Sequence, residues 1–348
     1  MTWMIYGAYG YTGRLVAALA AERGELPVLG GRDERRLRDL GEMFELEHRA
    51  FDLGDPAAVR RGLDGIDAVA HCAGPFSSTA APMVDACLAG GTHYLDITGE
   101  IDVFETVLGR TGEAEAAGVA LLPGSGFDVV PSDCLAASLA RAMPEAIRLE
   151  LAIKMGGGVS PGTAKTAMES LGTAARARVG GVIGPVPTDR RKRQVTFPDG
   201  KATVFAIAWG DVSTAYHSTG IGDIVVYAAL PAAVGAITGV AQMAGPAARA
   251  PFVQGTLKRL VGRLPGPSAK ARSEGPGQLW GQVTDRDGHR IAGTMTTLNG
   301  YDLTADAVVR IAQSLSAGKI EPGAHTPSQA FGPDFVRELD GTEVHALT

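Results

Sequence analysis

The chain has 348 residues, of which 45% are hydrophobic and 20% are charged, and this composition excludes a disordered chain and a collagen-like fibre. Its net charge of -6 at pH 7 would repel a phosphate backbone, so we expect no nucleic acid partner. Three scattered cysteines, Cys72, Cys87 and Cys134, do not suit a disulfide framework or a zinc site. The sequence therefore predicts a folded cytoplasmic protein without a metal, long enough for two domains.

Short apolar runs alternate with helical stretches from the start of the chain to about residue 126. The alternation indicates βαβ units and therefore a doubly wound parallel sheet, which is a Rossmann fold, over residues 1–128. The predicted strands are "WMIYG" (3–7), "LPVLGG" (26–31), "HRAFDL" (48–53), "DAVAHCAG" (67–74), "HYLDIT" (93–98) and "VALLPGSG" (119–126). The predicted helices between them cover 13–23, 33–43, 56–63, 79–90 and 102–117.

The pattern changes after about residue 131, and we predict a second α/β domain, with a mixed or antiparallel sheet, over residues 129–303. Turn residues between alternating runs predict two hairpins, one at "PDG" (198–200) and one at Asp287-Gly288. A strand at 146–155, a helix near 163–176 and a loop at 262–278 complete this domain, which we assign to the substrate. A helix near 304–317 and "PGAHTPSQAFG" (322–332) predict that a C-terminal segment, 304–348, returns to the Rossmann domain.

An uncharged stretch at 224–248 is long enough to span a bilayer. Its Ala and Gly content and Pro231 instead favour a short strand followed by a buried helix. The spacing at 252–264 predicts a basic amphipathic helix that either packs on its own domain or lies on a membrane surface. Peripheral membrane contact and a homodimer are therefore left open.

Three glycines spaced three residues apart follow the first predicted strand: Gly7, Gly10 and Gly13. Between a strand and a helix, such glycines allow a tight turn, a close approach of backbone N–H groups to a pyrophosphate, and close packing of the helix on the sheet. The N-terminus of that helix would add the positive end of its dipole. The side chains that could close over the phosphates are Tyr9, Tyr11 and Thr12.

The second predicted strand ends at Gly31 and is followed by Arg32, about where dinucleotide-binding domains read the adenine ribose. An acid there would bind the 2′-hydroxyl of NAD, whereas an arginine suits the 2′-phosphate of NADP. Arg32 therefore predicts NADP, with NAD the less favoured cofactor. The alternative is that Asp33 belongs to the ribose site and that Arg35 and Arg36 are solvated on the helix.

The third and fourth strands would supply the rest of the cofactor site. Asp52 ends the third strand and could border the adenine, and the nearby Asp55 could cap the next helix. Backbone at the end of the fourth strand would approach the nicotinamide ribose, through Cys72, Ala73, Gly74 and Pro75. The Cys72 side chain is more typical of a core residue than of a nucleophile.

Several motifs resemble those of the saccharopine dehydrogenase-like family of NAD(P)-dependent oxidoreductases, over nearly the whole chain. They are, in order, "GAYGYTG", "GGR", "CAGPF", "ACLAGGTHYLDITGE", "PGSGFDVVPSD" and "TPSQAFGPDFV". Two later segments, "STGIGDIVVYAALP" and "LPGPSAKARSEG", are similar to the branch of trans-acting enoyl reductases. The resemblance implies a Rossmann domain, an inserted substrate domain, and hydride transfer from a reduced nicotinamide to a C=N or polarised C=C bond.

Two enzyme hypotheses follow from this resemblance. The favoured one is reduction of a C=C bond in a small-molecule or carrier-bound acyl or polyketide-like substrate. The alternative is imine reduction of the saccharopine type, which needs basic residues for several carboxylates, and the candidates are Lys154, Lys165 and the run Arg190 to Arg193. A dinucleotide-binding scaffold protein is the non-enzyme alternative.

Hydride transfer to either bond leaves a group that must take up a proton, so a general acid is expected near the nicotinamide. Asp128 is the first candidate, because the resemblance implies an acid at this position. Tyr94 could also donate a proton, and Glu100 could orient the substrate or cap the helix that follows it. For each of these residues, the alternative is an ordinary hydrogen-bonding role at the end of a strand.

Overall fold

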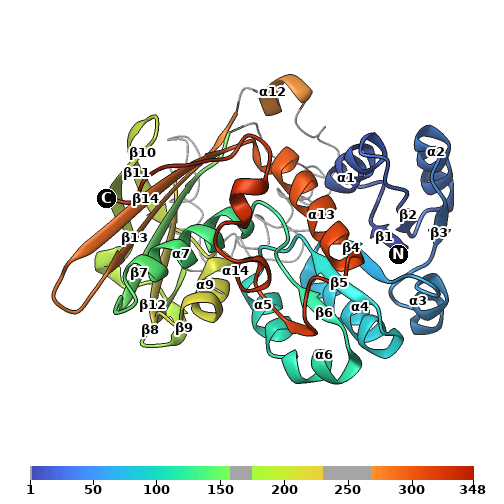
Figure 1. Cartoon of the computed structure of the whole chain (residues 1–348), viewed down its shortest axis with the longest axis horizontal. Coiled ribbons are helices and arrows are strands. Elements are labelled where there is room, and N and C mark those ends of the chain that lie inside the picture. Colours follow the sequence, from blue (N-terminus) through green and yellow to red (C-terminus); the bar gives the residue numbers. More distant parts are fainter. Residues whose placement is uncertain (1, 157–174, 230–267, 274) are drawn as a thin grey trace, which may run out of the picture. The chain divides into compact units, whose positions relative to one another are not determined.

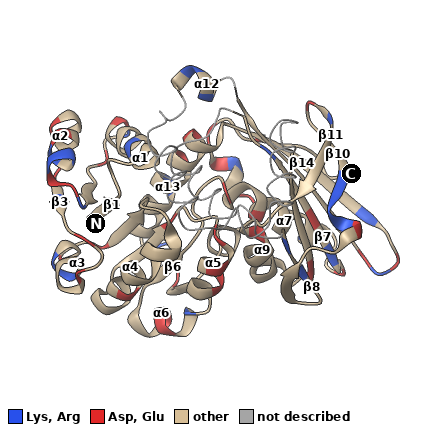
Figure 2. Ribbon diagram, turned by 180° about the vertical axis from the view of Figure 1, so that it is seen from behind, with Lys and Arg blue, Asp and Glu red and all other residues tan. Residues whose placement is uncertain are grey.

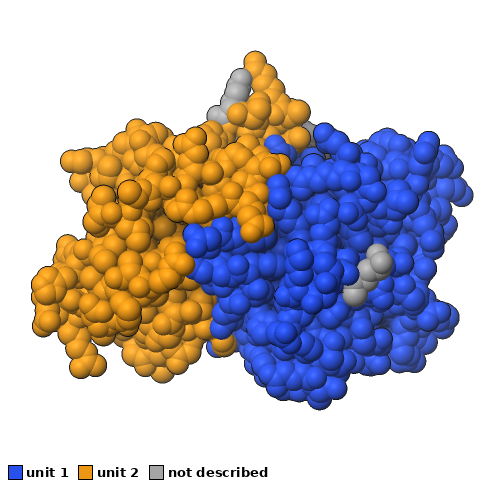
Figure 3. Space-filling view, viewed as in Figure 1, with its two compact units in different colours: residues 1–130, 301–335 blue, residues 131–300, 336–348 orange. Residues whose placement is uncertain are grey.

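The computed structural model describes residues 2–156, 175–229, 268–273 and 275–348. The chain divides into two compact units (Figure 3). Unit 1 consists of Met1–Val130 and Tyr301–Phe335, and unit 2 consists of Pro131–Gly300 and Val336–Thr348. Each unit is built from separated stretches of sequence.

Unit 1 contains a parallel sheet whose strands run in the order β15-β6-β5-β4-β1-β2-β3 (Figure 1). All four residues of β1 and of β4 are buried, as expected for strands covered on both faces. The predicted Rossmann sheet is confirmed. Its strands are β1 (Trp3–Tyr6), β2 (Val28–Gly31), β3 (His48–Ala50), β4 (Ala68–His71), β5 (His93–Asp96), β6 (Ala120–Leu122) and β15 (Gly323–Ala324).

Helices connect these strands, and most agree closely with the predicted ranges. The short helix at 327–331 was not predicted, and one predicted helix is divided. The single helix expected at 102–117 is two helices, because Gly109 ends the first and Arg110 precedes the second. The helices are α1 (Tyr11–Glu22), α2 (Glu34–Phe44), α3 (Pro56–Gly62), α4 (Phe76–Gly90), α5 (Ile101–Leu108), α6 (Thr111–Ala117), α13 (Gly300–Ser316) and α14 (Pro327–Phe331).

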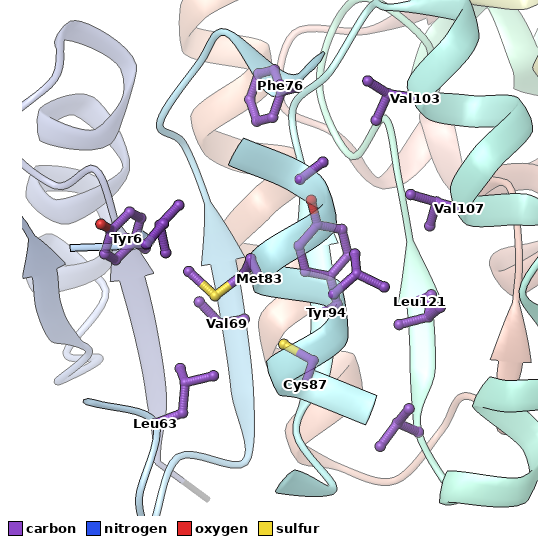
Figure 4. Packing of buried hydrophobic residues seen from close by; sticks show 14 of the residues in the cluster. Tyr6, Leu63, Val69, Phe76, Met83, Cys87, Tyr94, Val103, Val107 and Leu121 are labelled. Carbon is purple, nitrogen blue, oxygen red and sulfur yellow. The ribbon is translucent and has the colours of Figure 1, made fainter. Parts of the chain in front are cut away.

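The core of unit 1 packs these helices against the sheet (Figure 4). Met83 and Cys87 on α4 face Val69 of β4 and Tyr94 of β5, and all four side chains are buried. On the other side of the unit, α13 is fixed to α1, since Arg23 lies 2.6 Å from the carboxylate of the buried Asp306. This packing fixes the strands, and the loops of the candidate site begin at the carboxyl ends of these strands.

Unit 2 contains a mixed sheet, as predicted. Among the described residues its order is β10-β11-β12-β7-β13-β14-β16, with β8 paired to β12 and β9. Only the pairing of β12 with β7 is parallel. The strands are β7 (Arg148–Lys154), β8 (Arg176–Val179), β9 (Val182–Pro185), β10 (Lys192–Phe197), β11 (Gly200–Ala206), β12 (Asp223–Ala228), β13 (Gly277–Thr284), β14 (Arg290–Thr297) and β16 (Glu343–Val344).

Both predicted hairpins of unit 2 are present, as β10–β11 and β13–β14. Several elements of unit 2 were not predicted, among them α7 (Val130–Ala142), α9 (Asp211–Thr219), the strands β8, β9 and β16, and α12 (Ala269–Ser273) within the expected loop 262–278. The helix expected at 163–176 lies outside the described residues except at its end, where Arg176 begins β8 instead.

The apolar stretch 224–248 begins as the predicted strand, which is β12. Its remainder from residue 230 and the stretch 252–264 lie outside the described residues. Among the residues that the structure describes, no helix combines the length and the apolar character needed to cross a bilayer.

The end of the chain contributes to both units. Strand β15 pairs in parallel with β6 in unit 1, and α14 follows it. Residues 336–348 instead group with unit 2, where β16 pairs with β14. This differs from the predicted segment 304–348, which was assigned as a whole to the Rossmann domain.

Candidate functional site

The strand order of unit 1 reverses between β1 and β4, and ligands of such sheets bind at this point, beyond the carboxyl ends of the strands. Gly7 lies there with a φ of +86°, a conformation that favours glycine. A Cβ atom on Gly7 would lie 2.9 Å from the backbone of Cys72 and Ala73. Only a glycine lets the loops after β1 and β4 approach each other this closely.

The other two glycines of the loop fix the start of α1. Gly10 is the N-cap, and its N–H donates to the Gly7 carbonyl oxygen at 2.9 Å. A Cβ atom on Gly13 would lie 2.3 Å from that same oxygen, so the helix can pack this close only with a glycine there. The N-cap Gly10 supplies no side chain to cap α1, and the N-terminus of a helix is a binding site for an anion such as a pyrophosphate.

The side chains between the glycines take different positions. Tyr11 and Thr12 are half-buried in the first turn of α1, and the Tyr11 ring packs edge-on against Tyr301 of α13, with 4.9 Å between the ring centroids. Tyr9 instead extends toward the end of β2, where its hydroxyl accepts a hydrogen bond from the Arg32 N–H at 3.2 Å. Tyr11 therefore contacts α13, and Tyr9 contacts the residue that follows β2.

The end of β2 carries the residues that were expected to select the cofactor. Arg32 is exposed, and Asp33 caps α2 by accepting a hydrogen bond from the Arg36 N–H at 3.1 Å. This capping role gives Asp33 a structural function and weakens the alternative that it binds a ribose. Arg36 is exposed but does not extend away from the loop, because its guanidinium lies 4.5 Å from the centroid of the Tyr9 ring.

Asp52 lies after β3 at the same edge of the sheet. Its carboxylate accepts a hydrogen bond from the Gly54 N–H at 2.7 Å, and Asp55 caps α3, as its position suggested. Burial and the neighbouring Asp52 carboxylate raise the pKa of Tyr6, while Arg32 lowers it. Asp52 and Arg32 therefore share the surroundings of the Tyr6 hydroxyl, as expected for one adenosine-binding region.

The loop after β4 contains Cys72, Ala73, Gly74 and Pro75. The Cys72 N–H donates to the Tyr6 carbonyl oxygen at 2.8 Å, which continues the pairing of β4 with β1 beyond His71. Burial and the nearby Asp96 raise the pKa of the Cys72 thiol to about 12, so it is not a thiolate nucleophile at neutral pH. The Gly74-Pro75 peptide is cis.

Glu100 has a specific structural partner that the sequence did not indicate. Its carboxylate oxygens accept hydrogen bonds from the N–H groups of Phe76 at 2.9 Å and of Ser77 at 2.8 Å. The Glu100 side chain therefore caps α4, the helix before it, although Glu100 is the N-cap residue of α5, the helix that follows it. This contact fixes the loop containing Pro75 and argues against a catalytic role for Glu100.

Tyr94 lies inside the core rather than at the edge of the site (Figure 4). Its side chain is fully buried, and its hydroxyl donates to Asp96 Oδ2 at 2.7 Å. Burial above all, and then Asp96, raise its pKa well above the usual value. These observations argue against Tyr94 as the proton donor.

Asp96 ends the same strand as Tyr94, and the sequence placed it at this edge of the sheet without assigning it a role. Its Oδ1 accepts hydrogen bonds from the N–H groups of Thr98 at 3.0 Å and of Gly124 at 2.8 Å. It therefore joins the loops after β5 and β6, and burial raises its pKa to about 6. The spacing of Tyr94 and Asp96, two apart on one strand, places them on the same face and was the available signal.

Asp128 lies after β6, in the loop that also contains Gly124. The N–H of the adjacent Phe127 donates to the Thr304 hydroxyl of α13 at 2.9 Å, which anchors the loop. Asp128 is half-buried, and a Cβ atom on Gly99 would lie 2.9 Å from its Oδ2. Burial raises the pKa of Asp128 to about 6, which suits a proton donor near neutral pH.

Comparisons with known proteins agree with this description. Residues 3–122 match the family model described as "Saccharopine dehydrogenase NADP binding domain". Over 139 residues, 37% of the chain, the sequence is 30% identical to the trans-acting enoyl reductase of Mycobacterium leprae. Over 150 residues, also 37% of the chain, it is 29% identical to the saccharopine dehydrogenase-like oxidoreductase of Mus musculus. The matched part spans 33% and 35% of these two relatives.

The fold of the whole chain also has a solved counterpart. The apo saccharopine dehydrogenase (L-Glu forming) from Saccharomyces cerevisiae aligns over 99% of both chains with a TM-score of 0.64 and 12% sequence identity. At this identity the match shows a common fold. The predicted resemblance is confirmed: residues 3–122 match the model of a saccharopine dehydrogenase NADP-binding domain, and the chain shares the fold of saccharopine dehydrogenase.

Proposed function

We propose that this protein is an NADPH-dependent reductase that transfers hydride to a polarised C=C bond of an acyl or polyketide-like substrate. The NADP-binding domain and the relatives named as reductases and oxidoreductases support hydride chemistry. The choice of an acyl substrate over an imine with several carboxylates depends on one observation in unit 2.

That observation is the internal pairing of the basic side chains. Lys154 pairs with Asp199, Arg190 lies 3.5 Å from Asp223, and Arg193 lies 2.5 Å from Glu150. These are three of the candidates for binding substrate carboxylates in a saccharopine-type reaction. Arg191 and Lys192 of the same run are exposed, and Lys165 lies outside the described residues. Side chains already neutralised by acids are poor receptors for further carboxylates, so we favour an uncharged acyl chain.

The residues of unit 1 fit NADP. Gly7 lets the loops after β1 and β4 meet at the reversal point, the N-terminus of α1 would bind the pyrophosphate, and Arg32 offers a cation to the 2′-phosphate. The loop from Cys72 to Pro75 would contact the nicotinamide ribose, and Asp52 would border the adenosine. When bound, the reduced cofactor supplies the hydride.

Asp128 would supply the proton. Hydride addition to one carbon of the C=C bond leaves an enolate, and Asp128 would transfer its proton to the neighbouring carbon. Burial raises the pKa of Asp128 to about 6, so a minor fraction of the molecules carries this proton at neutral pH. The carboxylate that remains would recover its proton from solvent.

The test is to follow NADPH oxidation by absorbance with three acceptors: a 2-enoyl thioester of pantetheine, the same acyl group on an acyl carrier protein, and a mixture of a 2-oxo acid and an amino acid that forms an imine. We expect turnover with one or both thioesters. Turnover with the imine mixture alone would contradict the acyl assignment. Tight binding of NADPH without oxidation by any acceptor would support a scaffold protein instead.

A further inference from the structure

Helix α2 carries exposed arginines at 35, 36 and 38, and Figure 2 shows this basic stretch in blue. Of the three, Arg36 contacts the glycine loop. Its guanidinium lies 4.5 Å from the Tyr9 ring centroid, and its Nη2 donates to the Tyr9 carbonyl oxygen at 3.4 Å. An arginine stacked on an aromatic ring is held in place while part of its edge stays free to donate hydrogen bonds.

Tyr9 itself is fixed over the end of β2. Its hydroxyl accepts the hydrogen bond from the Arg32 N–H, and a Cβ atom on Gly31 would lie 2.7 Å from Tyr9 Cε1. A larger residue at 31 would therefore push the ring away. Tyr9 thus connects the glycine loop, the residue after β2, and α2.

Arg32 and Arg36, the two cations beside the Tyr9 ring, are not neutralised by acids among the described residues. Within the described parts of the chain, neither Arg32 nor Arg36 forms an ion pair, and Asp33 Oδ1 is occupied in capping α2. The end of the second strand is also where a Rossmann domain meets the 2′ position of the adenine ribose. Two cations without acid partners at this position indicate a site for a dianion.

We propose that Arg36 together with Arg32 binds the 2′-phosphate of NADP, and that Tyr9 is the positioning residue that holds the Arg36 guanidinium. The inference rests on the proposed function only in taking NADP as the nucleotide. It assigns cofactor selection to a contact between the glycine loop and α2, rather than to the residue after β2 alone.

The first experiment measures dissociation constants for NADPH and NADH by calorimetry. Charge-assisted hydrogen bonds to phosphate are strong, so Arg36→Ala should weaken NADPH binding about 10- to 100-fold and change NADH binding less than about twofold. Arg36→Lys keeps the charge but not the planar fork and should recover part of this loss. Arg38→Ala, on the same helix and also exposed, is the matched control and should change neither constant.

The second experiment separates Tyr9 as a positioning residue from a general role in folding. The ligands are 2′,5′-ADP and 5′-AMP, which differ only in the 2′-phosphate. Tyr9→Phe keeps the ring and should bind both ligands nearly as wild type does. Tyr9→Ala should weaken 2′,5′-ADP about 3- to 10-fold more than 5′-AMP, because the stacked guanidinium is released. Circular dichroism confirms that each variant is folded.

The outcomes distinguish this inference from the proposed function. If wild type prefers NADPH and Arg36→Ala keeps that preference, or loses affinity for NADPH and NADH equally, the 2′-phosphate assignment is wrong and the reductase proposal stands. If wild type binds neither nucleotide, both fail. If Tyr9→Ala weakens 2′,5′-ADP and 5′-AMP to the same extent, Tyr9 shapes the loop but does not position Arg36.

Discussion

Units 1 and 2 use the same residue types in different ways. In unit 1, Asp52, Asp96 and Asp128 follow or end three parallel strands of one sheet, β3, β5 and β6, so all three lie along the edge formed by the carboxyl ends of its strands. In unit 2, charged side chains lie within strands or in hairpin turns and pair with each other, as Glu150 does with Arg193. The comparison teaches that a charged side chain at the carboxyl end of a parallel strand is placed to contact a ligand. A charged side chain within a strand or a hairpin turn is instead placed to form a structural ion pair.

The sharpest test of this comparison is Asp128→Asn in unit 1. Loss of a general acid lowers kcat about 10²- to 10⁴-fold, and the dissociation constant for NADPH should stay near that of wild type. Because the protonated form acts and its pKa is about 6, wild-type kcat should fall as pH rises above 6. Steady-state rates between pH 5 and 9 check this, and an unchanged pH profile in the variant would mean that another group donates the proton.

Gly13→Ala tests whether the glycine loop depends on close approach as the geometry requires. The new Cβ would collide with the Gly7 carbonyl oxygen, so we expect a loss of about 3 kcal/mol in the free energy of unfolding and a loss of measurable NADPH binding. Urea unfolding and calorimetry measure both. Gly112→Ala is the control, because a Cβ there meets nothing within 4 Å on α6, and it should stabilise the protein slightly.

Asp96→Ala tests whether an acid at this edge of unit 1 has a structural role instead of contacting a ligand. We expect a loss of about 2 to 3 kcal/mol in the free energy of unfolding, because three buried donors lose their acceptor. Asp96→Asn keeps an acceptor and should lose less.

The pH dependence of stability gives a second readout for Asp96. Its pKa is raised from 3.8 to about 6 in the folded protein, so its contribution to stability is full below about pH 4 and is lost as pH rises through 6. The pKa of Asp128 is also raised, so Asp128 adds a similar pH dependence to wild type and to the variant. The contribution of Asp96 is therefore the difference in stability between wild type and Asp96→Asn at each pH. Asp96→Asn should flatten the change in stability between pH 4 and 7, and an unaltered slope would contradict the raised pKa.

Arg193→Met tests the other side of the comparison, in unit 2. The Arg193 guanidinium pairs with Glu150 and lies 4.6 Å from the centroid of the Trp280 ring, so we expect a loss of about 1 kcal/mol in stability. NADPH binding and the reduction of enoyl thioesters should not change. A selective loss of activity toward a carboxylate-bearing acceptor would instead return the imine hypothesis to favour.

Much of unit 1 was predictable because its signals are local. The strands are short apolar runs, the helices between them have clear ends, and Gly7, Gly10 and Gly13 stand together in the sequence. The hairpin β8–β9 also had a local signal that was overlooked: Gly180 and Gly181 both have positive φ values, of +56° and +83°, as a tight two-residue turn requires.

The missed contacts of the site join residues that are distant in sequence. Glu100 caps a helix that begins 24 residues earlier, and the Arg36 side chain reaches the Tyr9 carbonyl 27 residues away. No periodicity or spacing encodes such a pair, since it depends on how each loop leaves its strand. The close approach of the Tyr9 ring to Gly31 is a further contact of this kind, between the glycine loop and the end of β2.

The pairing of β15 with β6 has a consequence for how the chain folds as it is synthesised. Strand β6 is complete at residue 122, but its parallel partner at 323–324 follows only after about two hundred further residues. An unpaired strand edge attracts other chains, so unit 1 must emerge with this edge open while unit 2 is made. We therefore expect a chain shortened before residue 323 to aggregate more readily than the full chain, even though it retains the whole glycine loop.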